Sequence, residues 1–503
     1  MEKKHEYQVT DYAGKLAKGF LRNPLTSVLG AFLLIMGYLS LSIMPREEDP
    51  QIAISGGAVV VAMPGATPRE IENIIINPLE RKMREVKGIE HIYGQAFDNY
   101  GMVSVMYYIG ENREDANLKL YDKVMQNMDM MPKGVMQPLI KPFDIDIDIP
   151  ILTIAFYAKD KHVDDVKLFE IVRKLQQKIN AVDNVAKTTL KGARKAQYNI
   201  EVDMGKLSAY HLSLGQIMKA VQSVAVDVPD VKGRTKDNKL VIFGVKNAIE
   251  SVEDVGSVIV AQYMGSPIYL RDVAKVTEGM DIQNFQTAKV MFKDANGTTM
   301  GKERSQVTLT VAKLAGTNAV FVAEDVLDVL KEHEDEFAKE GVGYLITRNY
   351  GERANEAVNE LMHHLIITII IIALMLVFAL GWKESLIVTF TVPAILAVTL
   401  FVAYLSGQTI NRITLFAFLL SLGLLVDAAI IVIENIHRHL HAHDVDSKEM
   451  DELLIEATDE IGAPTNVATL AIILTMVPMA FVGGMMGSFM KPIPYNVPVA
   501  LIA

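Results

Sequence analysis

The chain has 503 residues, 50% of them hydrophobic, and a formal net charge of −11. This apolar composition favours a membrane protein over a soluble single domain, and the acidic balance argues against a nucleic-acid partner, because phosphate binding needs clustered Lys and Arg. The sequence contains no cysteine, which excludes disulfides, thiolate metal sites and cysteine nucleophiles.

Residues 1–24 are predicted to be a cytoplasmic segment, and residues 25–45 the first transmembrane span. The apolar run from Leu25 to Met44 has the length of about 20 residues that crosses a hydrocarbon core of about 30 Å. No small-residue cleavage site follows, so the run is not a removable signal peptide. Basic residues ahead of the span place the N-terminus in the cytoplasm; they are Lys3, Lys4, Lys15, Lys18 and Arg22.

Residues 46 to about 355 are expected on the other side of the membrane as an α+β domain. Thr67 and Glu70 form a capping box at the start of its first helix. Strand and helix patterns alternate in this region, at residues 52–62, 67–86, 102–108, 113–130, 151–157, 163–179, 185–190, 306–313 and 318–337. The alternation predicts a duplicated split βαβ (ferredoxin-like) unit.

We expect the first of these units at residues 46–141 and the second at residues 142–194 and 283–350. Residues 195–282 interrupt the second unit as an inserted subdomain. The insert has a helix pattern near residues 214–224 and then, in "VDVPDVKGRTKDNKLVIFGV", two strand-like runs around a turn rich in Pro, Gly and Lys.

The rest of the chain is predicted to be a membrane α-helical bundle, giving about six spans with the first. Spans two to four occupy residues 361–435, and residues 466–503 hold span five and a sixth span that is truncated at Ala503. Between them, residues 436–465 read as a cytoplasmic amphipathic linker helix that lies along the membrane surface.

The fourth span carries an acid, Asp427, among apolar residues. A carboxylate inside a span costs about 2.5 to 3.5 kcal/mol on insertion scales. Protonation removes most of this cost and so couples the proton to hydration and packing, as a proton relay requires. Gly423, Asp427 and Glu434 fall on one helix face, with Glu434 as a second, weaker relay candidate near the span end. Asp427 could instead accept structural hydrogen bonds, and Glu434 could simply be solvated.

Three stretches resemble the N-terminal half of resistance-nodulation-division (RND) efflux permeases of the hydrophobe/amphiphile, multidrug-type branch. They are "MPGATPREIENIIINPLERKMREVKGIEHI", "GLLVDAAIIVIEN" and "LAIILTMVPMAFVGGMMG". The resemblance makes the two βαβ units porter subdomains and the insert a docking-type subdomain. It implies a secondary active transporter rather than an enzyme, in the bacterial inner membrane with a large periplasmic domain.

The resemblance also implies the mechanism and the partners. Protons moving inward through Asp427 drive export of hydrophobic or amphiphilic small molecules, taken from the periplasm or the membrane lipid. In the family this Asp pairs with a Lys in the second half, so a missing C-terminal half of the permease is expected. The other implied partners are two further copies in a homotrimer, a periplasmic adaptor (membrane fusion protein) and an outer-membrane channel.

One departure concerns the residue after Asp427. Multidrug members often carry a second Asp there, whereas this chain has Ala428, as in the heavy-metal branch. Gly423 and Ala428 are expected to serve helix packing beside the relay. A heavy-metal exporter is therefore an alternative, because the 26 methionines offer soft ligands for Cu(I) or Ag(I), although Met also fills cores.

The substrate pocket and the remaining alternatives are less specific. Lys191 and Arg348 lie in strands expected to border the pocket and would suit anionic or amphiphilic cargo, or they could be solvated rim residues. "GTTMGKE" from Gly297 lacks the spacing of a P-loop. No cofactor and no resident metal site is expected. A related permease for lipids or protein export, or a non-transporting scaffold or receptor, are further alternatives.

Overall fold

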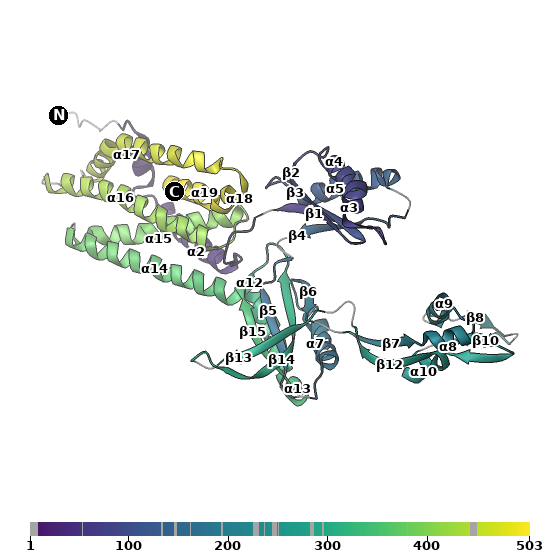
Figure 1. The fold of residues 1–503 in the computed structure, drawn as a ribbon. Helices are drawn as coiled ribbons and strands as arrows, with labels where there is room; N and C mark the ends of the chain where they lie inside the picture. Colours follow the sequence, from purple (N-terminus) through teal and green to yellow (C-terminus); the bar gives the residue numbers. More distant parts are fainter. Residues whose placement is uncertain are drawn as a thin grey trace, which may run out of the picture.

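The long apolar helices form one bundle, and the α+β units all lie on one side of it (Figure 1). The computed structural model describes residues 9–52, 54–131, 134–144, 148–160, 162–192, 195–224, 231–235, 237–243, 249, 251–281, 286–293, 296–379, 381–442 and 450–503. Lys3 and Lys4 of the predicted positive flank therefore lie outside the described residues, as do residues 193–194 and 282–285, where the insert was expected to join the second unit.

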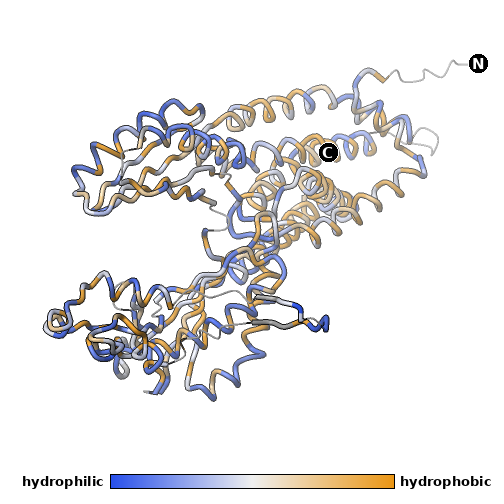
Figure 2. The backbone as a smooth tube through the Cα atoms, turned by 90° about the vertical axis from the view of Figure 1, so that its right-hand side faces the viewer, coloured by the Kyte–Doolittle hydropathy of each residue, from blue (hydrophilic) through white to orange (hydrophobic). Residues whose placement is uncertain are grey.

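Five helices are long and apolar enough to cross a membrane in the described part of the chain. They are α2 (Pro24–Ile43), α14 (Tyr350–Ala379), α15 (Trp382–Leu405), α16 (Arg412–Ala442) and α17 (Met450–Ala480). Shorter helices accompany them: α1 (Tyr12–Phe20), α18 (Gly484–Met490) and α19 (Pro492–Ile502). The long helices are mostly hydrophobic along their length, whereas the α+β units alternate in hydropathy (Figure 2).

Small residues let the bundle helices approach closely. A side chain at Gly37 of α2 would collide with Ala397 of α15, so glycine is needed at this crossing. The hydroxyl of Ser385 in α15 donates to the carbonyl of Ala373 in α14 at 2.7 Å. These contacts join α2, α14 and α15 into one packed group.

The predicted linker helix at residues 436–465 differs in the structure. Residues 436–442 continue α16, residues 443–449 lie outside the described residues, and residues 450–465 are the first half of α17, which runs without a break to Ala480. Leu453 and Ala457 of the amphipathic pattern are buried within the protein, and the carbonyl of Ala457 accepts from Asn435 of α16 at 2.7 Å. The apolar stripe that predicted a membrane-surface helix is thus a packing face.

The first α+β unit has a four-stranded sheet with the order β2-β3-β1-β4. All of its strand pairs are antiparallel. The capping box predicted at Thr67 and Glu70 is present. The sequence patterns did not predict β2 or β4. Its elements are β1 (Ser55–Ala62), α3 (Pro68–Ile71), η1 (Glu72–Ile76), α4 (Asn77–Met83), β2 (Ile89–Phe97), β3 (Tyr100–Tyr107), α5 (Arg113–Gln126), η2 (Met128–Met130) and β4 (Leu139–Asp144).

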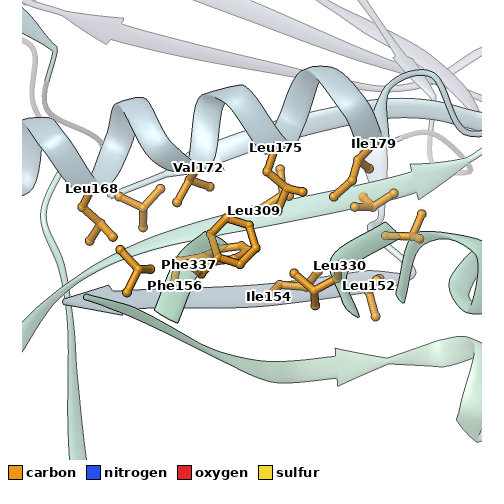
Figure 3. Packing of buried hydrophobic residues seen from close by; sticks show 14 of the residues in the cluster. Leu152, Ile154, Phe156, Leu168, Val172, Leu175, Ile179, Leu309, Leu330 and Phe337 are labelled. Atoms are coloured by element: carbon orange, nitrogen blue, oxygen red, sulfur yellow. The ribbon is translucent and has the colours of Figure 1, made fainter. Parts of the chain in front are cut away.

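The second unit repeats this order of connections. Its strands run β6-β14-β5-β15, again antiparallel, with β13 added beside β14. Helix α7 packs on β5 and β14 over an apolar core (Figure 3). Its elements are β5 (Leu152–Ala158), α7 (Asp165–Ile179), β6 (Val185–Lys191), β13 (Ala288–Lys293), β14 (Thr299–Lys313), α12 (Ala319–Glu332), α13 (Glu334–Lys339) and β15 (Val342–Asn349).

The insert extends from the second unit on two paired strands, β7 and β12 (Figure 1). It has an apolar core of its own. Strands β8 and β9 pair as a hairpin. Strand β9 lies in the second predicted strand-like run, β8 lies in the predicted turn, and residues 226–230 of the first run lie outside the described residues. Its elements are β7 (Ala196–Val202), α8 (Met204–Ala209), α9 (Leu214–Val224), β8 (Val231–Arg234), β9 (Leu240–Phe243), α10 (Val252–Gly256), β10 (Ile259–Tyr263), β11 (Ser266–Tyr269), α11 (Leu270–Val273) and β12 (Ala274–Met280).

The core of the first unit contains a tyrosine hydroxyl that lacks a partner. Tyr107 is buried and its hydroxyl makes no hydrogen bond within the described residues. Burial, and secondarily the charge of Glu111, raises the pKa of Tyr107 to about 12. The unfolded chain therefore ionises this group first, so stability is intact below pH 10 and falls as the pH rises toward 12.

We predict that Tyr107→Phe raises the free energy of unfolding by about 1 kcal/mol, because it removes an unsatisfied buried hydroxyl. It should also reduce the alkaline loss of stability by the share that Tyr107 contributes. Thermal unfolding of the purified chain at pH 8 and pH 11 tests both effects. Tyr108→Phe is the matched control, since the Tyr108 side chain is 55% exposed. Equal behaviour of the two variants would contradict the prediction.

Candidate functional site

Helix α16 has one face packed into the bundle and one face uncovered. Leu415, Phe418, Leu422 and Val426 point into the bundle core. The opposite face is exposed along the length of the helix, and its residues recur every three or four positions, which is the spacing of one helix face. They are Phe416, Leu420, Gly423, Asp427, Ile431 and Glu434. The structure thus places Gly423, Asp427 and Glu434 together, as the sequence predicts.

Asp427 lies near the middle of this uncovered face. It follows Arg412, the first residue of α16, by 15 positions, a distance of about 22 Å along a helix axis. Its carboxylate has no hydrogen-bond or ion-pair partner among the residues that the structure describes. Between Arg412 and Arg438 the sequence contains no Lys or Arg, and α17 contains none. Helices α16 and α17 therefore offer Asp427 no Lys or Arg along its own stretch of helix.

The two small residues beside Asp427 differ in their surroundings. No atom comes within 4 Å of the point where a Cβ would stand at Gly423. Ala428 is half-buried. Within the described residues no neighbouring helix uses the glycine for close packing, so the packing role expected for Gly423 stays a prediction.

Glu434 lies near the end of α16 beside a cavity of about 430 Å³. The cavity is lined by Ala379, Ile431, Glu434, Asn435, His437, Arg438 and Ile461. The other polar residues at this end are paired between helices. Arg438 donates to Glu460 of α17 at 3.1 Å, and His437 lies 3.3 Å from Glu384 of α15. Glu434 itself has no such partner in the described part of the chain, which leaves its carboxylate open to the cavity.

A buried ion pair joins the other end of α16 to the second α+β unit. The ammonium of Lys313, at the end of β14, lies 2.7 Å from Glu47, and their side chains are only 8% and 6% exposed. The backbone N–H of Glu47 donates to Ile410, just ahead of α16, at 3.0 Å. We call Glu47, Lys313 and Ile410 the bundle joint. Sequence reasoning missed it, because Glu47 and Lys313 are 266 positions apart.

Helix α14 makes a second connection between the same parts. Its first turn packs on α12, where a side chain at Gly351 would lie 2.8 Å from the carbonyl oxygen of Ala319. The backbone N–H of Ala319 in turn donates to Arg46 at 3.3 Å. The second unit is therefore attached to the bundle by α14 and by the segment that follows α2.

The structure does not bring Lys191 and Arg348 together. Lys191 is exposed at the end of β6, and Arg348 is half-buried in β15. Strands β14 and β5 separate them in the sheet, a distance of about 14 Å for three strand spacings. The Arg348 guanidinium stacks over the ring of Tyr350, 3.8 Å from its centroid. The two cations do not form one binding site.

We predict that Lys313→Met lowers the free energy of unfolding by about 3–5 kcal/mol, because it leaves Glu47 buried without its cation. The double variant with Glu47→Gln should recover part of this loss. Thermal unfolding of the purified chain measures both.

Lys289→Met is the control for the joint. It breaks an ion pair of similar length, 2.8 Å, whose side chains are 61% and 54% exposed, and exposed pairs contribute about 0–1 kcal/mol. If Lys313→Met and Lys289→Met unfold at the same temperature, the joint does not stabilise the protein.

Comparison with known proteins identifies relatives over nearly the whole chain. Residues 16–503 match the AcrB/AcrD/AcrF family. The chain is 26% identical over 487 residues to the toluene efflux pump membrane transporter TtgB of Pseudomonas putida, covering 94% of this chain and 44% of the relative. The same values hold for the multidrug/solvent efflux pump membrane transporter MepB and the antibiotic efflux pump membrane transporter ArpB of that organism. The chain spans less than half the length of these relatives.

Proposed function

The chain belongs to the AcrB/AcrD/AcrF family of RND permeases, and we propose that it supplies the proton-carrying half of an exporter of hydrophobic or amphiphilic small molecules. The names of its relatives, which are pumps for toluene, solvents and antibiotics, support this cargo class. The five long apolar helices support placement in the inner membrane, with the α+β units in the periplasm.

The observation that carries the proposal is Asp427 on the uncovered face of α16. An unpaired carboxylate at membrane depth is costly, so either a proton or a cation must neutralise it. We propose that the further half of the permease covers this face and supplies the cation. The open space at Gly423 would let that half come close to the carboxylate. In the proposed relay, the carboxylate of Asp427 is neutralised alternately by a proton and by this cation.

Glu434 is proposed to exchange protons between Asp427 and the cytoplasm. It lies seven residues further along the same exposed face and lines the cavity at the helix end. A carboxylate beside a hydrated cavity can take up and release protons without crossing apolar surroundings.

The bundle joint is proposed to carry the change at Asp427 to the α+β units. A shift of α16 would move Ile410, which is bonded to Glu47, and Glu47 holds Lys313 of β14. Packed elements transmit such shifts because interiors are dense and poorly compressible. The second unit would then move relative to the first.

The inward movement of one proton releases enough energy for useful transport. Each charge that crosses a potential of 100 mV supplies about 2.3 kcal/mol. This supports roughly a 50-fold gradient of a neutral solute.

We further propose that the two βαβ units are duplicated porter subdomains and that the insert is a docking subdomain. The shared order of strand connections supports the duplication. The proposed assembly is a homotrimer with a periplasmic adaptor and an outer-membrane channel. Heavy-metal export is the second candidate, since Ala428 stands where many multidrug relatives have an acid.

We predict that Asp427→Asn reduces efflux of a hydrophobic dye such as Nile red to the background of cells without the pump. The amide has the shape of the carboxyl group but cannot exchange a proton, so the relay stops. The measurement is dye efflux from energised cells that express the complete permease. Glu434→Gln should slow efflux less, because water can replace its proton exchange.

Protein level and thermal unfolding of both variants control for folding. Efflux at the normal rate in well-folded Asp427→Asn would overturn the proposed relay, whereas efflux by the unmutated permease no faster than the background would favour a scaffold or receptor. Efflux of Cu(I) or Ag(I) without dye efflux would favour the metal exporter.

Lys191 and Arg348 give a prediction on cargo. If each contacts anionic amphiphiles from its own side of the sheet, Lys191→Ala and Arg348→Ala should each weaken export of cholate. Because the strand order keeps them about 14 Å apart, the two losses should add within error in the double variant. Cholate efflux assays in intact cells provide the measurement, and a non-additive loss would indicate a shared pocket.

A further inference from the structure

The short helix α1 has an apolar stripe that the described residues leave uncovered. Tyr12, Leu16 and Phe20 are 77%, 58% and 43% exposed. They recur every four positions and therefore lie on one face of the helix. Exposed aromatic and leucine side chains in one stripe mark a surface that binds an apolar partner.

Contacts with α17 fix the direction in which this stripe faces. The carboxylate of Asp459 accepts from the backbone N–H groups of Thr10 at 3.0 Å and Asp11 at 2.8 Å. A side chain at Gly14 would collide with Asp459, and one at Gly462 would collide with Asp11. The two glycines let α1 and α17 pack closely, so α1 cannot turn its stripe toward α17.

Two further contacts place α1 at the polar end of the membrane spans. The amide of Asn466 in α17 donates to Asp11 at 3.0 Å, and from Val467 to Ala480 the sequence of α17 carries no charged residue. At its other end, α1 leads through Leu21 and Asn23 into α2, which begins at Pro24. The helix therefore lies where two spans change from polar to apolar.

Of the basic side chains of α1, Lys15 flanks the stripe, and Lys18 lies on the opposite side of the helix, two residues from both Leu16 and Phe20. Lys15 lies with its ammonium 5.5 Å from the centroid of the Tyr12 ring, and Lys18 is exposed one turn further along. Arg22 is paired with Asp451 of α17 at 2.5 Å. An apolar stripe beside lysines matches the two layers of an anionic membrane surface, acyl chains below and phosphates above.

We propose that α1 is an interfacial anchor that binds anionic phospholipids of the cytoplasmic leaflet. Tyr12, Leu16 and Phe20 enter the boundary of the acyl chains, and Lys15 and Lys18 contact lipid phosphates. Because Asp459 of α17 binds α1, the anchor fixes the position of the first half of α17 relative to the membrane surface. The anchor rests on the proposed membrane insertion of α2, but neither proton transport nor cargo is needed for it.

The absence of cysteine allows a direct test by single-site spin labelling. The full chain is reconstituted with one nitroxide at Leu16→Cys, Phe20→Cys, Lys18→Cys or Ala13→Cys, in vesicles with or without phosphatidylglycerol. Collision with oxygen reports lipid, and collision with a water-soluble nickel chelate reports water. We expect labels at positions 16 and 20 to favour oxygen in anionic vesicles, the label at 18 to favour nickel, and the label at 13 to be shielded from both.

Two controls separate this anchor from its premise. A label at Ile35→Cys in α2 should favour oxygen whenever the span is inserted, so its failure points to the proposed membrane insertion instead. Lys15→Gln with Lys18→Gln should remove the difference between anionic and zwitterionic vesicles at position 16. Labels at 16 and 20 that favour nickel, as the label at 18 does, would overturn the proposal. Labels shielded from both reagents would overturn it in favour of a protein contact.

Discussion

An acid in the middle of an apolar helix, with no partner among the described residues, is the constraint on which the rest of the structure depends. Asp427 lies about 22 Å along α16, on the face that no other described element covers. The other side of α16 is packed into the bundle, so the helix cannot rotate its carboxylate into the protein. Burial of a lone charge is costly. Whether Asp427 is protonated or ionised therefore decides whether its face of α16 can lie against apolar or only against polar surroundings.

Both ends of α16 are tied to other parts of the chain. At one end Ile410 and Glu47 connect it to Lys313 of the second α+β unit. At the other end Asn435 and Arg438 bind α17 through Ala457 and Glu460. These contacts are polar and short, and the one between Glu47 and Lys313 joins residues 266 positions apart. The helix that carries the acid is thus attached at one end to the α+β units and at the other to the helix that holds α1.

Local signals in the sequence predicted local features well. The capping box at Thr67 and the shared face of Gly423, Asp427 and Glu434 follow from spacing alone. The joint of Glu47 and Lys313 could not be predicted, because nothing local distinguishes a buried ion pair from two solvated charges. The amphipathic pattern at residues 450–465 predicts an apolar helix face but does not show what that face packs against. It therefore indicates a membrane-surface helix just as well as a helix packed within the protein. The cluster of acids after the first span was the one available hint of the joint.

The central claim is that Asp427 gains and loses a proton at membrane depth. Infrared difference spectroscopy of the reconstituted complete permease tests it most directly, with Asp427→Asn as the reference that lacks the group. The account predicts a protonated carboxyl band that appears on acidification, shifts in deuterium oxide and is missing from the variant. A spectrum in which wild type and variant show the same bands at every pH would contradict the account.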